Sequence, residues 1–380
     1  MKQILLYLTW YDYRIHRGVA QIAREAGWHL ICPKGEADRK RVLNGWQGDG
    51  CIALIDSPEQ FETFHAKKIP IVDLGVTHHQ FPIPRIATDN SAIGNLAASH
   101  FLDRGYREIF MAPSMGIPMF KERLKAAQEG MKAGGGCVTL LKNSNWKWTD
   151  VLNQLEKISL DRGGPLSQQS FAFFAYEDYR AAELISVCLE KGLSIPDNIA
   201  VLGIDNDDLI NEGLGVGLSS VDSDQEGLGR AAAHILQQRL NEPNKEFETN
   251  ILRHPPLGLT IRKSTDYYSV RSILVANSLR WIHHHFKEGI QAVDVARAMK
   301  VTQQGLQKEF SIHHLRSPGE EIRFQRVEAA ALQLVQAPAK LSDIAERCGY
   351  YTVDSMISNF KKAYGVTPGK YRKQHSSESS

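Results

Sequence analysis

The chain has 380 residues, enough for two or three domains, and a nearly balanced charge, with 45 Lys and Arg against 43 Asp and Glu. It contains no run of 18 apolar residues, which argues against a membrane span. The five cysteines are scattered without a C-x-x-C spacing, which argues against a disulfide framework or zinc site. We therefore expect a cytoplasmic protein with no bound metal or cofactor.

The first two-thirds of the chain predicts alternating strands and helices. The opening MKQILLYLTW lacks the length and cleavage site of a signal peptide and instead predicts a first strand. Short apolar runs predict strands at 3–8, 28–32, 50–55, 69–75, 107–112, 170–174 and 199–205, and amphipathic stretches predict helices at 14–26, 58–67, 90–104, 119–133, 177–191 and 224–240. This alternation indicates parallel sheets covered by helices on both faces, and its length favours two lobes. The polar stretch 143–168 predicts an exposed connection.

After residue 270 the strand pattern stops, and the sequence predicts about seven helices. Residues 270–380 hold 16 Lys and Arg against 10 Asp and Glu, a net charge of +6, whereas the preceding part carries a net −4. This asymmetry indicates a polyanionic partner for the C-terminal part only. We expect a first domain at 1–267, a second at 271–374 and a disordered tail at 375–380.

The C-terminal part contains two helix-turn-helix candidates, 293–310 and 341–365, on either side of a long helix at about 318–335. In such a motif the second helix lies in the DNA major groove and its outward side chains meet base edges. Capping residues mark three helix starts at Thr302, Ser317 and Thr367. The long helix is expected to bury a stripe made of Ile322, Val327, Ala330, Ala331 and Leu334.

The string LSDIAERCGY, followed by NFKKAYGVTPGKYR, resembles the signature of the AraC/XylS family of bacterial transcription regulators. The resemblance covers about residues 271–373 and implies two helix-turn-helix units, joined by a rigid helix, that read successive major-groove segments of operator DNA. The second helices are aligned by their closing Phe310 and Phe360. This alignment gives the base-reading candidates Gln304, Gln307 and Lys308 in the first unit and Val353, Asp354, Ile357 and Ser358 in the second.

Four cations near the end of the chain are candidates for phosphate contacts: Lys361, Lys362, Arg372 and Lys373. The alternative is that they form only a solvated basic face. Adjacent histidines, His283–His285, could suggest a metal site, but neighbouring residues of a helix point in different directions, so we expect surface positions.

The strings TDNSAIGNLAASHFLDRG and VLGIDNDDLINEG resemble the two-lobed sugar-binding core of LacI-type repressors and periplasmic binding proteins over about residues 1–265. Sugar hydroxyls require converging carboxylate, amide and guanidinium groups. Matching the cleft positions of that family gives the sugar-binding candidates Arg123, Asp205 and Asn206, followed by Tyr11, Asp12, Glu177 and Asp178. The alternative for Asp205 and Asn206 is that they cap the following helix.

The two resemblances together imply a ligand-responsive transcription activator. Their order, a sugar-binding core followed by an AraC-type tail, and the strings IPMFKERLKAAQEG and KGLSIPDNIAVLGIDN resemble regulators of pentose use, which implies D-xylose or a related pentose as effector. They also imply a homodimer on paired operator sites and contact with RNA polymerase. Two alternatives stay open: the same architecture could serve another sugar's operon, or the chain could be a sugar-modifying enzyme with a DNA-binding tail. The sequence shows no converging general acid and base, so we expect no enzyme activity.

Overall fold

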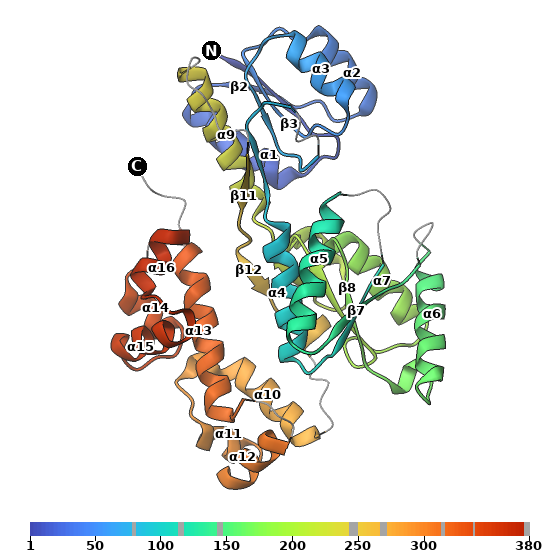
Figure 1. Ribbon diagram of the computed structural model, residues 1–380, viewed down its shortest axis with the longest axis vertical. Helices are drawn as coiled ribbons and strands as arrows, with labels where there is room; N and C mark the ends of the chain where they lie inside the picture. Colours follow the sequence, from blue (N-terminus) through green and yellow to red (C-terminus); the bar gives the residue numbers. More distant parts are fainter. Residues whose placement is uncertain are drawn as a thin grey trace.

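The computed structural model describes residues 1–77, 81–112, 118–142, 147–242, 250–266, 272–312, 316–336 and 339–375. Figure 1 shows two α/β lobes and, beside them, a bundle made only of helices. The predicted tail at 375–380 lies outside the described residues apart from its first position, as does the junction at 267–271.

Lobe 1 is built on a six-stranded sheet with the order β11-β5-β4-β3-β1-β2, in which every pair is parallel. Helices α1 and α9 cover one face, where Ile15 and Val19 pack against Leu228 and Leu236, and helices α2 and α3 cover the other. The elements are β1 Gln3–Tyr7, α1 Tyr13–Glu25, β2 His29–Ile31, α2 Glu36–Gly45, β3 Gly50–Ala53, α3 Pro58–Ala66, β4 Ile71–Asp73, β5 Arg85–Thr88, α9 Gln225–Asn241 and β11 Ile251–His254.

Lobe 2 is built on a second six-stranded sheet with the order β12-β10-β9-β8-β6-β7, in which only β12 is antiparallel to its neighbour. Helices α4 and α5 cover one face, and α6 and α7 the other. The elements are α4 Asn90–Asp103, β6 Glu108–Met111, α5 Pro118–Ala133, β7 Cys137–Leu140, α6 Trp148–Asp161, η1 Leu166–Gln168, β8 Phe171–Phe174, α7 Asp178–Glu190, β9 Ile199–Ile204, α8 Asp208–Gly213, β10 Ser219–Asp222, β12 Gly258–Thr260 and η2 Lys263–Thr265.

One sequence prediction in this region is wrong. The stretch 143–168, expected to be an exposed connection, contains α6, whose Trp148, Val151 and Leu155 are buried against lobe 2. Val151 and Leu155 are four residues apart and share one helix face, but the polar residues around them obscure this short stripe.

The chain crosses between the lobes three times: from β5 to α4, from β10 to α9, and from β11 to β12. The crossings are tied together, since the Asp89 N–H donates to the His254 carbonyl at 2.7 Å and the His254 ring contacts Asp224 Oδ2 at 2.8 Å. The lobes are therefore joined by a multi-stranded hinge.

The helical domain has the seven α-helices that the sequence predicts within its described residues. They are α10 Ile273–His285, α11 Ala292–Ala298, α12 Gln303–Ile312, α13 Pro318–Gln336, α14 Leu341–Arg347, α15 Val353–Tyr364 and α16 Pro368–His375, with a 3-10 turn η3 at Phe286–Glu288. The predicted caps are confirmed. Thr302 Oγ1 accepts from the Gly305 N–H at 3.1 Å, Thr367 Oγ1 accepts from the Lys370 N–H at 3.4 Å, and Ser317 forms a reciprocal capping box with Glu320.

Helix α13 belongs to two hydrophobic cores. Its Ile322 packs with the first helix-turn-helix unit, whereas Val327 and Leu334 pack with the second, as the predicted stripe requires. Between them, the buried Arg326 donates to the carbonyls of Phe286 and Ile290, both at 2.8 Å. Because one helix lies in both cores, the two units hold a fixed relative orientation.

Candidate functional sites

The carboxyl end of β9 carries two residues in a strained backbone conformation. Asp205 and Asn206 have φ angles of 99° and 48°, a region that residues other than glycine rarely adopt. The Asp205 carboxylate accepts hydrogen bonds from Ser223 Oγ at 2.6 Å and Gln225 Nε2 at 3.2 Å. Such strain, held in place by surrounding hydrogen bonds, is typical of ligand sites.

The capping alternative for these two residues is wrong. Asp207 is the N-cap of α8, because its Oδ1 accepts from the N–H groups of Leu209 and Ile210. The side chain of Asn206 bonds instead to Asp222 at 3.1 Å and to Arg262 at 2.8 Å. The Asn206 amide is therefore already engaged on both its oxygen and its nitrogen.

Arg123, on α5, is 6% exposed and is held by hydrogen bonds. Its Nε donates to Asn90 Oδ1 at 2.8 Å and its Nη1 to the Tyr176 carbonyl at 2.6 Å. Burial lowers the pKa of Arg123, whereas the neighbouring carboxylates of Asp205 and Glu177 oppose that shift. Among the described residues, none accepts a hydrogen bond from Nη2.

Glu177 and Asp178, after β8, differ in their surroundings. Glu177 lies 3.3 Å from Arg180, and burial raises the pKa of its carboxyl. Asp178 is fully buried and accepts from Ser220 Oγ at 2.7 Å and the Asp207 N–H at 2.8 Å. Burial raises the pKa of Asp178 to about 8, and its contacts fix the loop after β9.

The lobe 1 candidates follow β1. Asp12 caps α1 by accepting from the Arg14 N–H at 2.8 Å and also forms an ion pair with the Arg14 side chain at 2.6 Å. Tyr11 is half-exposed, and its hydroxyl contacts the His16 ring at 3.0 Å. Asp12 therefore has a structural function in the free protein, whereas much of the Tyr11 ring is open to solvent.

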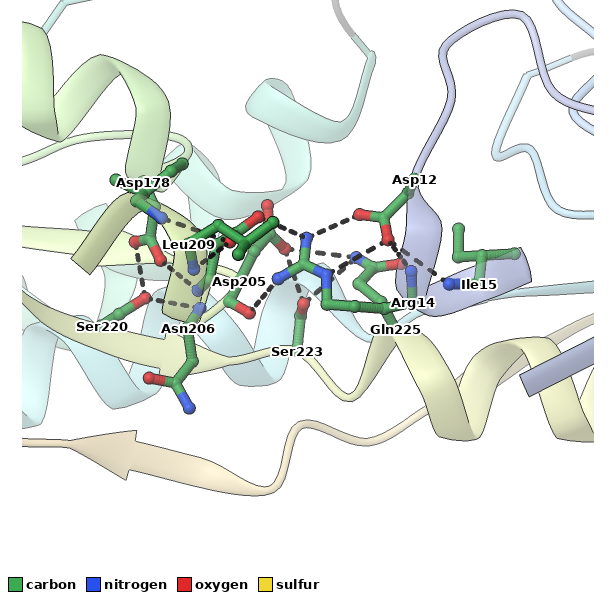
Figure 2. A network of polar contacts seen from close by, with 12 residues as sticks. Asp12, Arg14, Ile15, Asp178, Asp205, Asn206, Leu209, Ser220, Ser223 and Gln225 are labelled. Atoms are coloured by element: carbon green, nitrogen blue, oxygen red, sulfur yellow. Dashed lines mark hydrogen bonds and ion pairs between the residues drawn. The ribbon is translucent and has the colours of Figure 1, made fainter. Parts of the chain in front are cut away.

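Arg14 connects the lobes and was not predicted. Its Nη1 donates to the Asp205 carbonyl at 2.5 Å, and Figure 2 shows it extending from α1 in lobe 1 to the Asp205 loop in lobe 2. Arg14 thereby joins Asp12 and Asp205 in one polar network, which also includes Ser223 and Gln225. In the sequence, Arg14 has no feature that separates it from a surface arginine.

The base-reading candidates of the first unit all lie on the outer face of α12. Gln304, Gln307 and Lys308 are exposed and line one shallow depression, while Leu306 and Phe310 on the opposite face are buried. This face is free of contacts with the rest of the helical domain among the described residues, as groove insertion requires.

The candidates of the second unit are less uniform. On α15, Asp354 and Ser358 are exposed, whereas Ile357 is half-buried and Val353 packs partly against the core. The phosphate candidates Lys361, Lys362 and Lys373 are exposed. Arg372 differs, because its Nη2 donates to the Ala339 carbonyl at 2.6 Å and fixes α16 against the start of α14.

Three families match consecutive parts of the chain. A XylR N-terminal domain matches residues 6–91, a periplasmic binding protein-like domain residues 98–265, and a helix-turn-helix domain residues 295–374. With the fold, these matches define a DNA-binding transcription regulator with a two-lobed periplasmic-binding-like domain followed by an AraC-type helical domain. The predicted fold class is confirmed, and the enzyme alternative is contradicted because the relatives are transcription regulators.

Whole-length relatives share this order of domains. The chain is 27% identical over 374 residues to the xylose operon regulatory protein of Escherichia coli (strain K12), covering 95% of this chain and 94% of the relative. The protein of the same name from Haemophilus influenzae is 27% identical, with 95% of each chain covered. The solved structure of the xylose-binding transcription activator xylR is 26% identical, with a TM-score of 0.59 and 99% and 98% of the two chains covered. The chain is thus a homologue of the xylose operon regulatory proteins.

Among the residues that the structure describes, no helix is long and apolar enough to span a membrane, and no cluster of side chains is suited to a metal ion.

Proposed function

We propose that this protein is a sugar-responsive transcription activator that binds D-xylose between its lobes and operator DNA through its helical domain. The observation that carries the proposal is the similarity over nearly the whole chain, in both domains, to proteins named as xylose operon regulators and a xylose-binding activator. The domains meet near residues 267–271. The protein acts as a homodimer in the cytoplasm, beside RNA polymerase.

The polar groups of the cleft support a sugar as the ligand. Arg123 and Glu177 from lobe 2 lie within electrostatic reach of Asp205, so a charged donor and charged acceptors converge at the carboxyl ends of the strands. Charged groups form stronger hydrogen bonds to hydroxyls than neutral groups do. The exposed rings of Trp10 and Tyr11, on the lobe 1 side, offer an apolar face for a sugar ring.

A thermal-shift panel of pentoses and hexoses on the purified chain tests the effector. D-xylose at about 100 times its Kd is expected to stabilise the protein by roughly 2.7 kcal/mol, or about 5–10 °C in Tm for a domain of this size. A larger shift in Tm with another sugar would identify that sugar as the effector and its operon as the one that is regulated. No shift with any sugar would overturn the sugar effector while leaving the DNA-binding function intact.

Lys308→Ala is expected to weaken DNA binding by about 1–3 kcal/mol and to relax base preference at one position, because Lys308 is exposed on the outer face of α12. The matched variant Lys361→Ala should instead weaken binding to all DNA sequences equally and reduce the salt slope of binding by about one unit. Binding titrations against single-base operator variants at several salt concentrations separate the two. Uniform loss with Lys308→Ala would show that it touches phosphate only.

A further inference from the structure

Helix α4 extends from the candidate sugar site to the helical domain. At its first residue, Asn90 accepts from Arg123 Nε at 2.8 Å and donates to Glu122 Oε2 at 3.0 Å. At its last residue, Asp103 accepts from Arg316 Nη1 at 3.0 Å. Figure 1 shows α4 running from the junction of the lobes towards α10. One helix therefore contacts both functional regions.

Helices α4 and α5 pack too closely to slide past one another. A Cβ added at Gly94 would lie 2.4 Å from the Arg123 carbonyl oxygen, and one at Gly130 would lie 2.8 Å from the Ala98 Cβ. Backbones in such close contact leave no space for independent motion, because protein interiors are close-packed. A displacement of Arg123 by a ligand would therefore carry α4 with it.

Arg316 holds the helical domain to the far end of α4. Besides Asp103, it lies 3.4 Å from Glu321 and stacks over the Phe324 ring at 3.7 Å from the ring centroid. Glu321 is 6% exposed, so the ion pair on that side is sheltered from solvent. These contacts fix the direction in which the guanidinium meets Asp103.

Further contacts join the helical domain to lobe 2. The His284 ring lies 3.1 Å from Asp266 Oδ2, at the end of lobe 2. Leu332 packs so closely on Gly258 that an added Cβ would lie 2.7 Å from its Cδ1. His283, expected at the surface, is half-buried here, and burial lowers its pKa to about 4, which keeps it uncharged beside Arg104. The helical domain is thus docked on lobe 2 around the C-terminal end of α4.

We propose that α4 transmits the state of the sugar cleft to the DNA-binding domain, and that Arg316 and Asp103 are the positioning residues that make this transmission possible. The inference rests on the proposed function. The pair is partly exposed and adds little to stability by itself. Its effect is on the coupling between sugar and DNA binding, which in allosteric proteins typically spans about 5- to 150-fold.

The test uses the full chain, D-xylose, and a DNA duplex that the unmodified chain selects from a random-sequence pool with D-xylose present. The quantity measured is the ratio of the DNA Kd without sugar to the DNA Kd with sugar. Asp103→Asn and Arg316→Gln are each expected to lower this ratio by about three- to ten-fold, with the Kd for D-xylose unchanged within two-fold. The double variant should fall no further than either single variant, since both remove one interaction.

Arg323→Gln is the matched control, because Arg323 is an exposed arginine on the adjoining helix α13 without a described contact to lobe 2. It should keep the ratio of the unmodified chain. Circular dichroism of each variant confirms folding. Ratios unchanged in both single variants would overturn the inference alone. A ratio of one in the unmodified chain would instead overturn the proposed function, so the two failures are distinguishable.

Discussion

Arg123→Met is expected to remove the stabilisation of the protein by D-xylose, with a loss in sugar affinity of roughly 100-fold. Each hydrogen bond from a buried charged group contributes about 1.5–3 kcal/mol, so loss of one or two bonds reaches that size. Arg123 is buried, and the described residues occupy only its Nε and Nη1. Calorimetric titration with D-xylose measures the effect directly.

Lys121→Met is the control for that experiment, because Lys121 is an exposed cation two positions earlier on α5. It should bind D-xylose as the unmodified chain does. Arg123→Lys, which keeps the charge but loses the planar fork, should fall between the two. Tight binding by folded Arg123→Met would show that the ligand contacts other groups and would move the candidate site away from α5.

Gly349→Ala is expected to abolish specific DNA binding while leaving sugar binding intact. Gly349 has a φ of 77°, and an added Cβ would lie 2.5 Å from the Phe286 carbonyl oxygen and 2.8 Å from the Lys287 Cα. Both are backbone atoms that cannot move aside, so the α14–α15 turn must shift. The second unit would then lose its fixed orientation relative to the first, and the two could no longer enter successive major-groove segments together.

Gly365→Ala separates this collision from the cost of the backbone conformation alone. Gly365 has a φ of 73°, but an added Cβ meets nothing within 4 Å. This variant should lose only about 1–2 kcal/mol of stability and keep its DNA specificity. Gel-shift titrations with a specific and a scrambled duplex compare the two variants. Equal affinities of the two variants for the specific duplex would show that the close backbone contact at Gly349 is not required for specific DNA binding.

The sequence predicts most of the fold because its elements carry strong local patterns. The stripe of α13 is an example: Val327, Ala330 and Leu334 recur at helical spacing, and all three are buried in the structure. Helix α6 was missed because only a few apolar side chains, among them Val151 and Leu155, face lobe 2 within a polar stretch. Short edge strands such as β11 and β12 also lack an alternating pattern of their own, because only their neighbours in the sheet define them.

The candidate site is predicted less completely. Asp205, which follows a strand, and Arg123, which lies on a helix, could be predicted because they match cleft positions of a family that the sequence resembles. The structure brings the two within electrostatic reach of each other. Arg14 and Gln225 could not be predicted, because their importance comes from contacts across 191 and 20 positions of sequence. Such contacts depend on how the lobes meet, which no local pattern contains. The sugar and DNA contacts of all these residues remain predictions.

The three crossings between the lobes have a consequence for how the protein is made. Lobe 1 combines residues 1–88 with α9 and β11, which leave the ribosome only after nearly all of lobe 2. Until then, Ile15 and Val19 of α1 lack their partners Leu228 and Leu236. The nascent lobe 1 therefore exposes an apolar face for more than a hundred residues of synthesis, and such a face makes a folding chain prone to aggregation. A chain ending at Asp222 would leave both lobes incomplete, so neither can be obtained by a single truncation.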